Sequence, residues 1–266
     1  MSEVQTAGTR SMIKRPEEVV LMAESGRLLA AVFGYLDGLA LVGMSTMQVN
    51  DLVDRYIVQS LGARPASKGQ YGYAYALNAS RNDVVCHGVP STTEILHSGD
   101  IVNFDITLEK NGYIADSSKT YLVGAVAPAA RDLVQVTYDA MWAGIQAVRP
   151  GAQLGDVGHA IERHARRNGC TVVRDYCGHG IGRAMHEAPQ VRHWGKRRTG
   201  LVLQEGMVFT IEPMLNQGQH GVCKRDDGWT VVTQDGSLSA QFEHTVAVTR
   251  TGVRVLTLRA DENRLA

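Results

Sequence analysis

The sequence has few cysteines, and their spacing excludes two kinds of site. Only four occur among 266 residues, and no two of them form a C-x-x-C pair. So few thiols do not build a disulfide framework, and without paired thiolates a structural zinc site is disfavoured. We therefore expect a protein that works in the reduced state, in the cytoplasm.

A long apolar run is also missing. The longest run near the start, 28–36, stops at Asp37, well short of the roughly 20 residues that a membrane span needs. Residues 1–12 are polar and contain no apolar signal core. These absences predict a chain that is neither secreted nor bound to a membrane.

The chain also has no net charge at pH 7 with His neutral. Its 27 basic and 27 acidic residues cancel, which argues against a broad basic surface for DNA or other nucleic acid, but not against a local concentration of charge. Hydrophobic residues make up 44% of the chain, enough for a substantial core and too much for general disorder. No linker divides the chain, so we expect a loose tail over 1–12 and a single domain over 13–266.

Apolar periodicity and capping residues predict the helices and strands. Pro16 suits a first helical position, Ser45 is a helix cap, and Pro150 ends a helical pattern. Helices are expected at 16–38, 45–61, 128–148 and 154–168, and strands at 101–108, 113–123, 171–175, 207–214, 230–233 and 242–249.

The two halves of the chain share a pattern at an offset of 107 residues. Gly99 and Gly206 each precede an apolar strand, and Asp105 and Glu212, also 107 residues apart, stand near the ends of these strands. The simpler interpretation is that two strands of one sheet share a pattern. The alternative is a duplicated helix-plus-strand unit, whose pseudo-twofold axis would place one site between two halves.

Four carboxylates lie inside apolar strands, where burial is costly unless the charge is paired or binds a metal. They are Asp105, Asp116, Glu212 and Glu243. Each alone is best interpreted as a solvent-facing residue, but together with His179 in a glycine-flanked turn they predict a metal site. One divalent ion would leave this set at −2 and two would neutralise it, which favours a dinuclear site. Oxygen ligands with one imidazole suit Co, Mn, Fe or Zn.

Several motifs in order give the chain a family resemblance. They are 84–88 (VVCHG), Asp105 in its strand, 116–119 (DSSK), 176–182 (YCGHGIG), 186–189 (HEAP), 209–214 (FTIEPM) and 241–245 (QFEHT). From about 13 to 258 the chain closely resembles the type I methionine aminopeptidases, which remove the initiator methionine from new proteins. The resemblance implies the pita-bread fold, an α+β fold with pseudo-twofold duplicated helix-plus-strand halves around a central, mainly antiparallel sheet.

The resemblance also implies a role for each matching residue. His87 would contact the nitrogen of the scissile bond and His186 its carbonyl side. Glu212 would act as the general base while a bridging hydroxide attacks the scissile carbonyl. N-terminal methionine would be released, preferably before a small second residue. The ligands of two divalent ions would be Asp105, Asp116, His179, Glu212 and Glu243.

The substrate pocket matches the family less closely than the metal site does. Gln70 and Asn78 depart from the usual residues, and Met185 replaces a usual Phe. The methionine side chain would be held by Tyr73, Met185 and Trp229, and a monovalent cation, Na or K, by Asn82, Val84 and Ser239. The partners expected are nascent polypeptide N-termini, with transient association with the ribosome, and the enzyme is expected to be a monomer.

Other readings of the sequence stay open at this point. A related pita-bread peptidase that cuts before proline would normally carry an additional N-terminal domain. A silent binding module on the same fold would be expected to have lost ligands. A mononuclear iron oxygenase needs two histidines and one carboxylate, whereas this set has one histidine and four carboxylates.

Two local motifs are weaker. Cys86 beside His87 suggests a thiol nucleophile, but neighbours on an extended strand point to opposite faces, so a packed thiol is favoured. His159 and His164 lie five residues apart, which fails the H-E-x-x-H pattern, so their helix is expected to present a solvated face.

Overall fold

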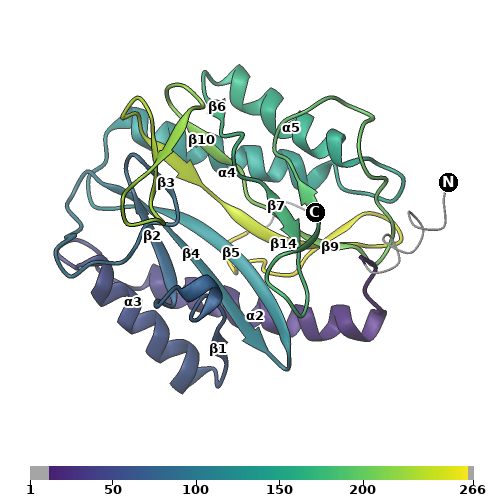
Figure 1. The fold of residues 1–266 in the computed structure, drawn as a ribbon, viewed down its shortest axis with the longest axis horizontal. Coiled ribbons are helices and arrows are strands. Elements are labelled where there is room, and N and C mark those ends of the chain that lie inside the picture. The colour runs from purple at the N-terminus through teal and green to yellow at the C-terminus, as the bar shows by residue number, and fades with distance from the viewer. Residues whose placement is uncertain (1–11, 263–266) are drawn as a thin grey trace.

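Helices pack on a central sheet in the computed structural model, which describes residues 12–262 (Figure 1). Of the tail expected over 1–12, all but Met12 lies outside the described residues. The helices are α2 (Pro16–Asp37), α3 (Thr46–Arg55), α4 (Pro128–Gln146) and α5 (Leu154–Arg167). All four expected helices are confirmed, except that the second passes into a π-turn over Tyr56–Ser60.

Capping explains where the second helix begins. The Ser45 hydroxyl accepts a hydrogen bond from the Gln48 N–H at 3.1 Å, and the Gln48 side chain accepts one from the Ser45 N–H at 2.8 Å. This reciprocal pair satisfies two backbone groups that a helix start otherwise leaves without partners.

The main sheet has antiparallel pairings and the order β1-β4-β5-β14-β9-β7-β8, with β2 beside β4 and β15 beside β14. Its strands are β1 (Arg64–Pro65), β2 (Leu77–Arg81), β4 (Ile101–Lys110), β5 (Tyr113–Leu122), β7 (Gly178–Gly180), β8 (Glu187–Val191), β9 (Val208–Ile211), β14 (Glu243–Val248) and β15 (Val253–Val255). This arrangement confirms the expected α+β class with a mainly antiparallel sheet.

Two small sheets lie beside the main one. The first has the order β13-β10-β6 and the second β11-β12-β3. Their strands are β3 (Val84–Cys86), β6 (Thr171–Val172), β10 (Met214–Asn216), β11 (Val222–Lys224), β12 (Val231–Thr233) and β13 (Ser239–Gln241). The single strand expected over 207–214 was wrong, because the chain leaves the main sheet after Ile211 and Pro213 has no N–H to continue a ladder.

The two halves of the chain meet where β5 pairs with β14, with Ser118 opposite Glu243. Each half has its own apolar cluster. Phe33 and Phe104 belong to the cluster that includes α2 and α3, while Trp142 and Phe209 belong to the cluster that includes α4 and α5. The main sheet therefore joins two similar layers along one central strand pair.

α2 has the length and composition of a membrane span, a feature that a search for unbroken apolar runs does not find. In its most apolar 18-residue window, 44% of the residues are buried inside the protein. Leu29, Val32 and Phe33 are fully buried in the first apolar cluster. The apolar composition of α2 thus supplies the core beneath β4 and β5.

Candidate functional site

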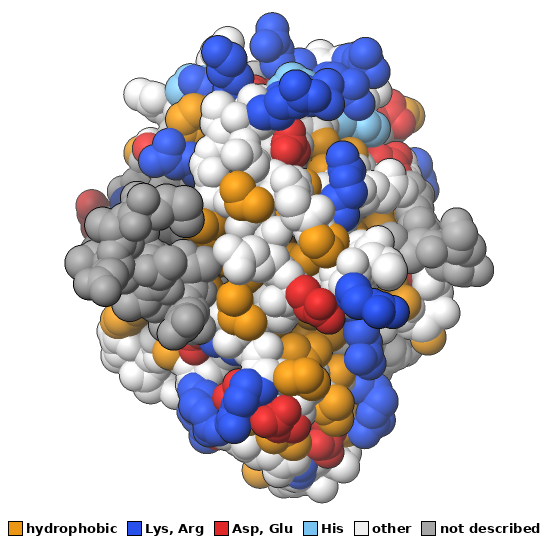
Figure 2. Space-filling view, turned by 90° about the vertical axis from the view of Figure 1, so that its right-hand side faces the viewer, with side chains coloured by type: hydrophobic (Ala, Val, Ile, Leu, Met, Phe, Trp, Pro, Cys, Tyr) orange, Lys and Arg blue, Asp and Glu red, His pale blue; other side chains and the backbone are white. Residues whose placement is uncertain are grey.

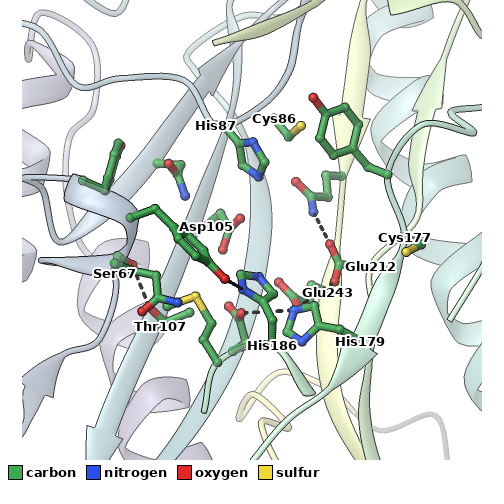
Figure 3. A pocket seen from close by; sticks show the side chains of 18 of the residues that line it. Ser67, Cys86, His87, Asp105, Thr107, Cys177, His179, His186, Glu212 and Glu243 are labelled. Carbon is green, nitrogen blue, oxygen red and sulfur yellow. Dashed lines mark hydrogen bonds and ion pairs between the residues drawn. The ribbon is translucent and has the colours of Figure 1, made fainter. Parts of the chain in front are cut away.

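A cavity of about 450 Å³ is lined by residues from both halves (Figure 3). The structure brings into its lining every residue that the sequence assigned to metal ligation, catalysis or the methionine pocket. These are Tyr73, His87, Asp105, Asp116, His179, Met185, His186, Glu212, Trp229 and Glu243. Gln70 and Asn78, the two departures from the family pattern, also line it.

The strand register positions the carboxylates. Asp105 lies on β4 and Asp116 on β5, while Glu243 begins β14 and Glu212 directly follows β9. The inner strand pair thus carries Asp116 and Glu243, and the strands outside it lead to Asp105 and Glu212. Asp105 and Glu212, which are 107 residues apart in the sequence, therefore lie on opposite sides of the β5–β14 pair, each on or next to the strand beside it.

His179 on β7 completes a compact group of possible ligands. One ligand atom from each of Asp116, His179 and Glu243 can be chosen so that all lie within 4.8 Å of one another. His179 Nε2 also lies 3.5 Å from Glu212 Oε1 and 3.8 Å from Asp116 Oδ2. Such spacing suits one or more shared cations.

Two buried carboxylate oxygens in this group have no hydrogen-bond partner among the described residues. They are Asp116 Oδ1 and Glu243 Oε1. An unsatisfied buried acceptor is unfavourable, and a metal cation would satisfy both oxygens. The residues present therefore fit the binding of divalent ions.

Burial dominates the electrostatics of the carboxylates. Desolvation raises the pKa of Asp105 to about 7 and that of Glu212 to about 8. Desolvation and the neighbouring acids together hold the pKa values of Asp116 and Glu243 well above their ordinary range. Because bound cations favour the charged forms, this site is poised to exchange protons for metal ions.

The His179 ring is fixed in one tautomer. Its Nδ1 donates to the carbonyl oxygen of Gly180 at 3.0 Å, which leaves the Nε2 lone pair directed at the acids. Burial lowers the pKa of His179 to about 4, so the ring is neutral at physiological pH. A neutral imidazole with its far nitrogen anchored is the form that ligates metals.

Glu212 is held by residues that the sequence analysis did not assign. The Thr210 hydroxyl donates to Glu212 Oε1 at 2.7 Å, and Gln241 Nε2 lies 3.5 Å from Oε2. The buried His193 ring accepts the Glu212 N–H at 3.1 Å. Thr210 and Gln241 lie inside the quoted motifs, but His193 had no local signal.

His87 and His186 also line the cavity. Burial lowers the pKa of His87 to about 4, and it also lowers that of His186. The Tyr176 ring meets His87 edge to face at 5.4 Å, and Tyr71 stacks beside His186 with ring centroids 6.0 Å apart. Tyr71 is a further lining residue that the sequence analysis missed.

The expectation that Cys86 and His87 point to opposite faces was wrong, since both line the cavity (Figure 3). β3 ends at Cys86, and His87 adopts the left-handed conformation with φ 56°, which breaks the alternation of the strand. Burial nevertheless raises the pKa of the Cys86 thiol well above its ordinary value. A protonated, packed thiol remains the better interpretation.

Aromatic and thioether side chains are part of the cavity lining. The Tyr73 and Trp229 rings lie 5.0 Å apart, and the Tyr73 hydroxyl donates to the Leu77 carbonyl oxygen at 2.9 Å. Met185 is buried and also lines the cavity. These side chains offer an apolar, polarisable surface to a substrate side chain.

The residues expected to hold a monovalent cation lie elsewhere. Asn82, Val84 and Ser239 are not part of the cavity lining, and the Ser239 N–H donates to the Asn82 carbonyl oxygen at 2.9 Å. Asn82 has a left-handed backbone with φ 55°. Cation binding by these residues stays a prediction.

Comparisons with known proteins agree with this geometry. The model of metallopeptidase family M24 matches residues 20–250. The chain is 45% identical over 241 residues to methionine aminopeptidase A of Synechocystis, covering 91% of this chain and 95% of that protein. It is 43% identical over 250 residues to the Escherichia coli methionine aminopeptidase, covering 94% and 95%.

A solved structure gives the same result. The methionine aminopeptidase of Rickettsia prowazekii superposes with a TM-score of 0.90 at 44% identity, covering 92% of this chain and 99% of that one. The expected pita-bread fold is confirmed. The chain is therefore a member of metallopeptidase family M24, with the metal-binding potential that this family implies.

Proposed function

We propose that the chain removes the N-terminal methionine from nascent proteins and peptides in a metal-dependent hydrolysis. One domain over residues 13–266 would carry the activity, in the cytoplasm and as a monomer. The observation that carries the proposal is the set of buried, partly unsatisfied carboxylates beside a neutral histidine in a cavity with an apolar wall. The relatives named above support the choice of methionine as the side chain.

Asp105, Asp116, His179, Glu212 and Glu243 would hold two divalent ions, Co, Mn, Fe or Zn. When bound, such ions supply a water of lowered pKa and polarise the scissile carbonyl, as in the aminopeptidases that the two-metal mechanism covers. Two ions would also neutralise the four carboxylates, which are otherwise buried close together.

Glu212 would serve as the general base. Thr210 and Gln241 hold its two oxygens in place, so the carboxylate can accept a proton from water without a change of position. It would then pass this proton towards the leaving amine. Burial raises the pKa of Glu212 to about 8 without cations, and bound cations would favour the charged carboxylate that can accept a proton.

The two histidines would orient the peptide bond. Neutral His87 would contact the scissile nitrogen, and His186 would stabilise the negative charge that develops on the carbonyl oxygen. Tyr73, Met185 and Trp229 would receive the methionine side chain. A free α-amino group near the ions would make the enzyme an exopeptidase, and a small second residue would be preferred. Na or K at Asn82, Val84 and Ser239, and transient contact with the ribosome, belong to the same proposal.

The test compares peptides and metal states. Met-Ala-Ser, Leu-Ala-Ser and Ala-Pro-Ser are offered to chelated protein and to protein reloaded with each of the four metals. We expect metal-dependent release of Met from the first peptide and little cleavage of the others. No metal-dependent release of Met would refute the activity, faster release of Leu would refute the pocket assignment, and cleavage before Pro would favour the alternative peptidase.

A further inference from the structure

A buried group of charged side chains lies near the C-terminus, outside the cavity. Charged side chains are usually exposed, as on the face of the molecule in Figure 2. The side chains of Arg259 and Glu262, by contrast, are each only 3% exposed, and that of His244 is fully buried. None of these three residues lines the cavity. Burial of charges is costly even when they are paired, which makes this group a candidate for a role beyond stability. We call Thr257, Arg259 and Glu262 the C-terminal clamp.

The guanidinium group of Arg259 spans the junction of the two halves. Its Nη1 donates to Ser117 Oγ at 3.1 Å and to the Ser118 carbonyl oxygen at 3.3 Å, both on β5 of the first half. Its Nη2 donates to Glu262 Oε1 at 3.0 Å and lies 3.3 Å from His244 Nε2. The segment that carries Arg259 follows β15, which pairs with β14 of the second half. One planar fork therefore bonds to both halves.

Two aromatic contacts extend this connection to the helices. The Arg259 guanidinium lies 5.2 Å from the centre of the Phe33 ring on α2. The His244 ring meets the Trp142 ring of α4 edge to face, with centroids 5.6 Å apart. Phe33 and Trp142 belong to the two different apolar clusters. The charged group thus lies on the helix side of the β5–β14 pair and contacts the core of each half.

Ser117 connects Arg259 to Glu243, one of the proposed ligands. Its hydroxyl donates to the Glu243 carbonyl oxygen at 2.7 Å while it accepts the hydrogen bond from Arg259. Neighbouring residues on a strand point to opposite faces. Asp116 and Glu243 line the cavity, whereas Ser117 and His244, the next residue on each strand, do not. The clamp therefore acts on the backbone behind the carboxylates.

A second series of hydrogen bonds connects the clamp to Asp116. Thr245 Oγ1 accepts the Asp116 N–H at 3.1 Å and donates to the Asp116 carbonyl oxygen at 2.7 Å. The Thr245 N–H donates to Thr257 Oγ1 at 3.1 Å, and this oxygen lies 2.9 Å from His244 Nδ1. Side-chain hydroxyls thus bond to the backbone of both carboxylate residues, and the clamp bonds to those hydroxyls or to the backbone beside them.

The distance between Asp116 and Glu243 depends on these bonds. In the part of the chain that the structure describes, the register of β5 with β14 comprises two pairs, Ser118 with Glu243 and Ser117 with His244. So short a ladder fixes the strand separation weakly, and the buried hydroxyls complete it. Residues that hold metal ligands in place control metal affinity nearly as strongly as the ligands themselves.

We propose that the C-terminal clamp positions Asp116 and Glu243 for the divalent cations that these two carboxylates share. Arg259 is the central positioning residue, because it alone of the clamp bonds to both strands' halves through one rigid group. The inference rests on the proposed function, since it takes the cations proposed there as the bound group. It assigns to the clamp an effect on cation affinity, beyond its contribution to stability.

Cation affinity measures this positioning without reference to catalysis. The chelated full chain competes with a chromogenic chelator for Zn²⁺, and the titration gives its dissociation constants. R259K keeps a cation beside Glu262 but lacks the second arm that reaches Ser117 and Ser118. We expect R259K to bind Zn²⁺ about 10- to 100-fold more weakly, the usual loss when a group that orients a metal ligand is removed.

A second variant tests the route through Ser117. S117A removes the hydroxyl between Arg259 and Glu243 and should also weaken Zn²⁺ binding about 10- to 100-fold. In the S117A background, R259K should then weaken binding less than about threefold further, because residues of one network have non-additive effects. Losses that multiply in full would overturn the assignment of Arg259 as a residue that acts through Ser117.

A matched control separates positioning from loss of stability. V157A removes buried methyl groups from α5, which packs mainly on α4 and β6. It should lower Tm but change Zn²⁺ affinity less than about twofold. All titrations are made at a temperature at which far-UV circular dichroism shows every variant folded. In R259K, the Zn²⁺ concentration for half-maximal cleavage of Met-Ala-Ser should rise by the same factor as the dissociation constant, while KM at saturating Zn²⁺ stays unchanged.

Wild-type Zn²⁺ affinity in folded R259K would overturn the proposal, and so would an equal loss of affinity in V157A at an equal loss of Tm. The proposed activity can fail separately. If R259K and S117A lose Zn²⁺ affinity as expected but the wild-type protein releases no Met, the activity is refuted and the clamp stays assigned. If the wild-type protein cleaves Met-Ala-Ser and R259K binds Zn²⁺ normally, the activity stands and the clamp is refuted.

Discussion

His179 Nδ1 donates to the carbonyl oxygen of the next residue, Gly180, at 3.0 Å, and this bond orients the other ring nitrogen towards Glu212, 3.5 Å away. One backbone carbonyl thus selects both the tautomer and the direction of the ring. The proposed ligation of a metal by His179 would need no further rearrangement of the imidazole.

Replacement of Glu212 by Gln should reduce kcat for Met-Ala-Ser by about 10²–10⁴-fold, the range that a general base contributes. The amide keeps the size of the side chain but cannot take a proton from water. Steady-state kinetics with the metal-loaded protein measure the effect. E205Q, a change at an exposed glutamate outside the cavity, is the matched control and should leave kcat unchanged. A wild-type rate in E212Q would remove Glu212 as the base.

The metal-free protein should lose stability as pH rises from about 6.5 to 8. Asp105 and Glu212 have folded-state pKa values of about 7 and 8, above the 3.8 and 4.5 of the free side chains, so the folded state binds more protons in this window. Their contribution is present at low pH and is lost as pH passes the folded pKa values. His87 and His179, lowered to about 4, act in the opposite direction only below their ordinary value near 6.5.

Thermal unfolding in EDTA tests this expectation. Tm should fall by about 5–10 °C across the window, and bound metal should abolish the decline, because the ligands are then already deprotonated. D105N should flatten the decline in EDTA, whereas D226N, at an exposed position, should not. A Tm that is constant or rises in EDTA would contradict the assignment of buried, protonated carboxylates.

The sequence could predict this site because its carboxylates interrupt apolar strands, an arrangement that is costly without a cation. The helices were predictable for the related reason that their caps and apolar faces are local signals. The break in the strand after Ile211 was not predictable, because the run through Met214 is mostly apolar. Only Pro213 marks the point where the chain changes sheet.

Contacts between residues that are distant in the sequence could not be predicted from it. His193 lies 19 residues before Glu212 and meets its backbone only after β7, β8 and β9 have assembled. The left-handed backbone of His87 likewise depends on how β3 leaves its sheet, because the preference of His for positive φ is too weak to place this conformation from the sequence.

Tyr71 should set the pH dependence of catalysis through His186. It is 74% exposed, and its hydroxyl lies 3.5 Å from His186 Nδ1 while its ring covers part of the imidazole. Desolvation lowers the pKa of His186, so Y71A should raise this pKa and move the acid limb of kcat/KM up by about half a pH unit.

Y71F is the matched variant, because it keeps the ring and removes only the hydroxyl. Its acid limb should stay near that of the wild type. Profiles that coincide for the wild type, Y71A and Y71F would show that Tyr71 does not shield His186.

Arg259 should be a large contributor to stability. This buried arginine donates to Ser117 Oγ at 3.1 Å, to the Ser118 carbonyl oxygen at 3.3 Å and to Glu262 at 3.0 Å. R259M leaves the buried Glu262 without its cation and should lower the free energy of unfolding by about 3–5 kcal/mol. Urea denaturation at pH 7 measures the loss.

Two further variants separate charge from packing at Arg259. R259M/E262Q should recover part of the lost stability, because no unpaired carboxylate remains. R254M, at an exposed arginine of β15, should change stability by less than about 0.5 kcal/mol. A loss in R254M as large as that in R259M would indicate a general effect of arginine removal in the C-terminal segment.

The pairing of β5 with β14 couples the association of the two halves to the binding of ions between them. Of the proposed ligands, Asp105 and Asp116 belong to one half, and His179, Glu212 and Glu243 to the other, so neither half alone contains the complete proposed set. Ions that bind only the joined arrangement stabilise that arrangement by mass action, and association of the halves tightens ion binding by the same factor. Ion binding and the association of the two halves are thus linked, and a measurement of one reports on the other.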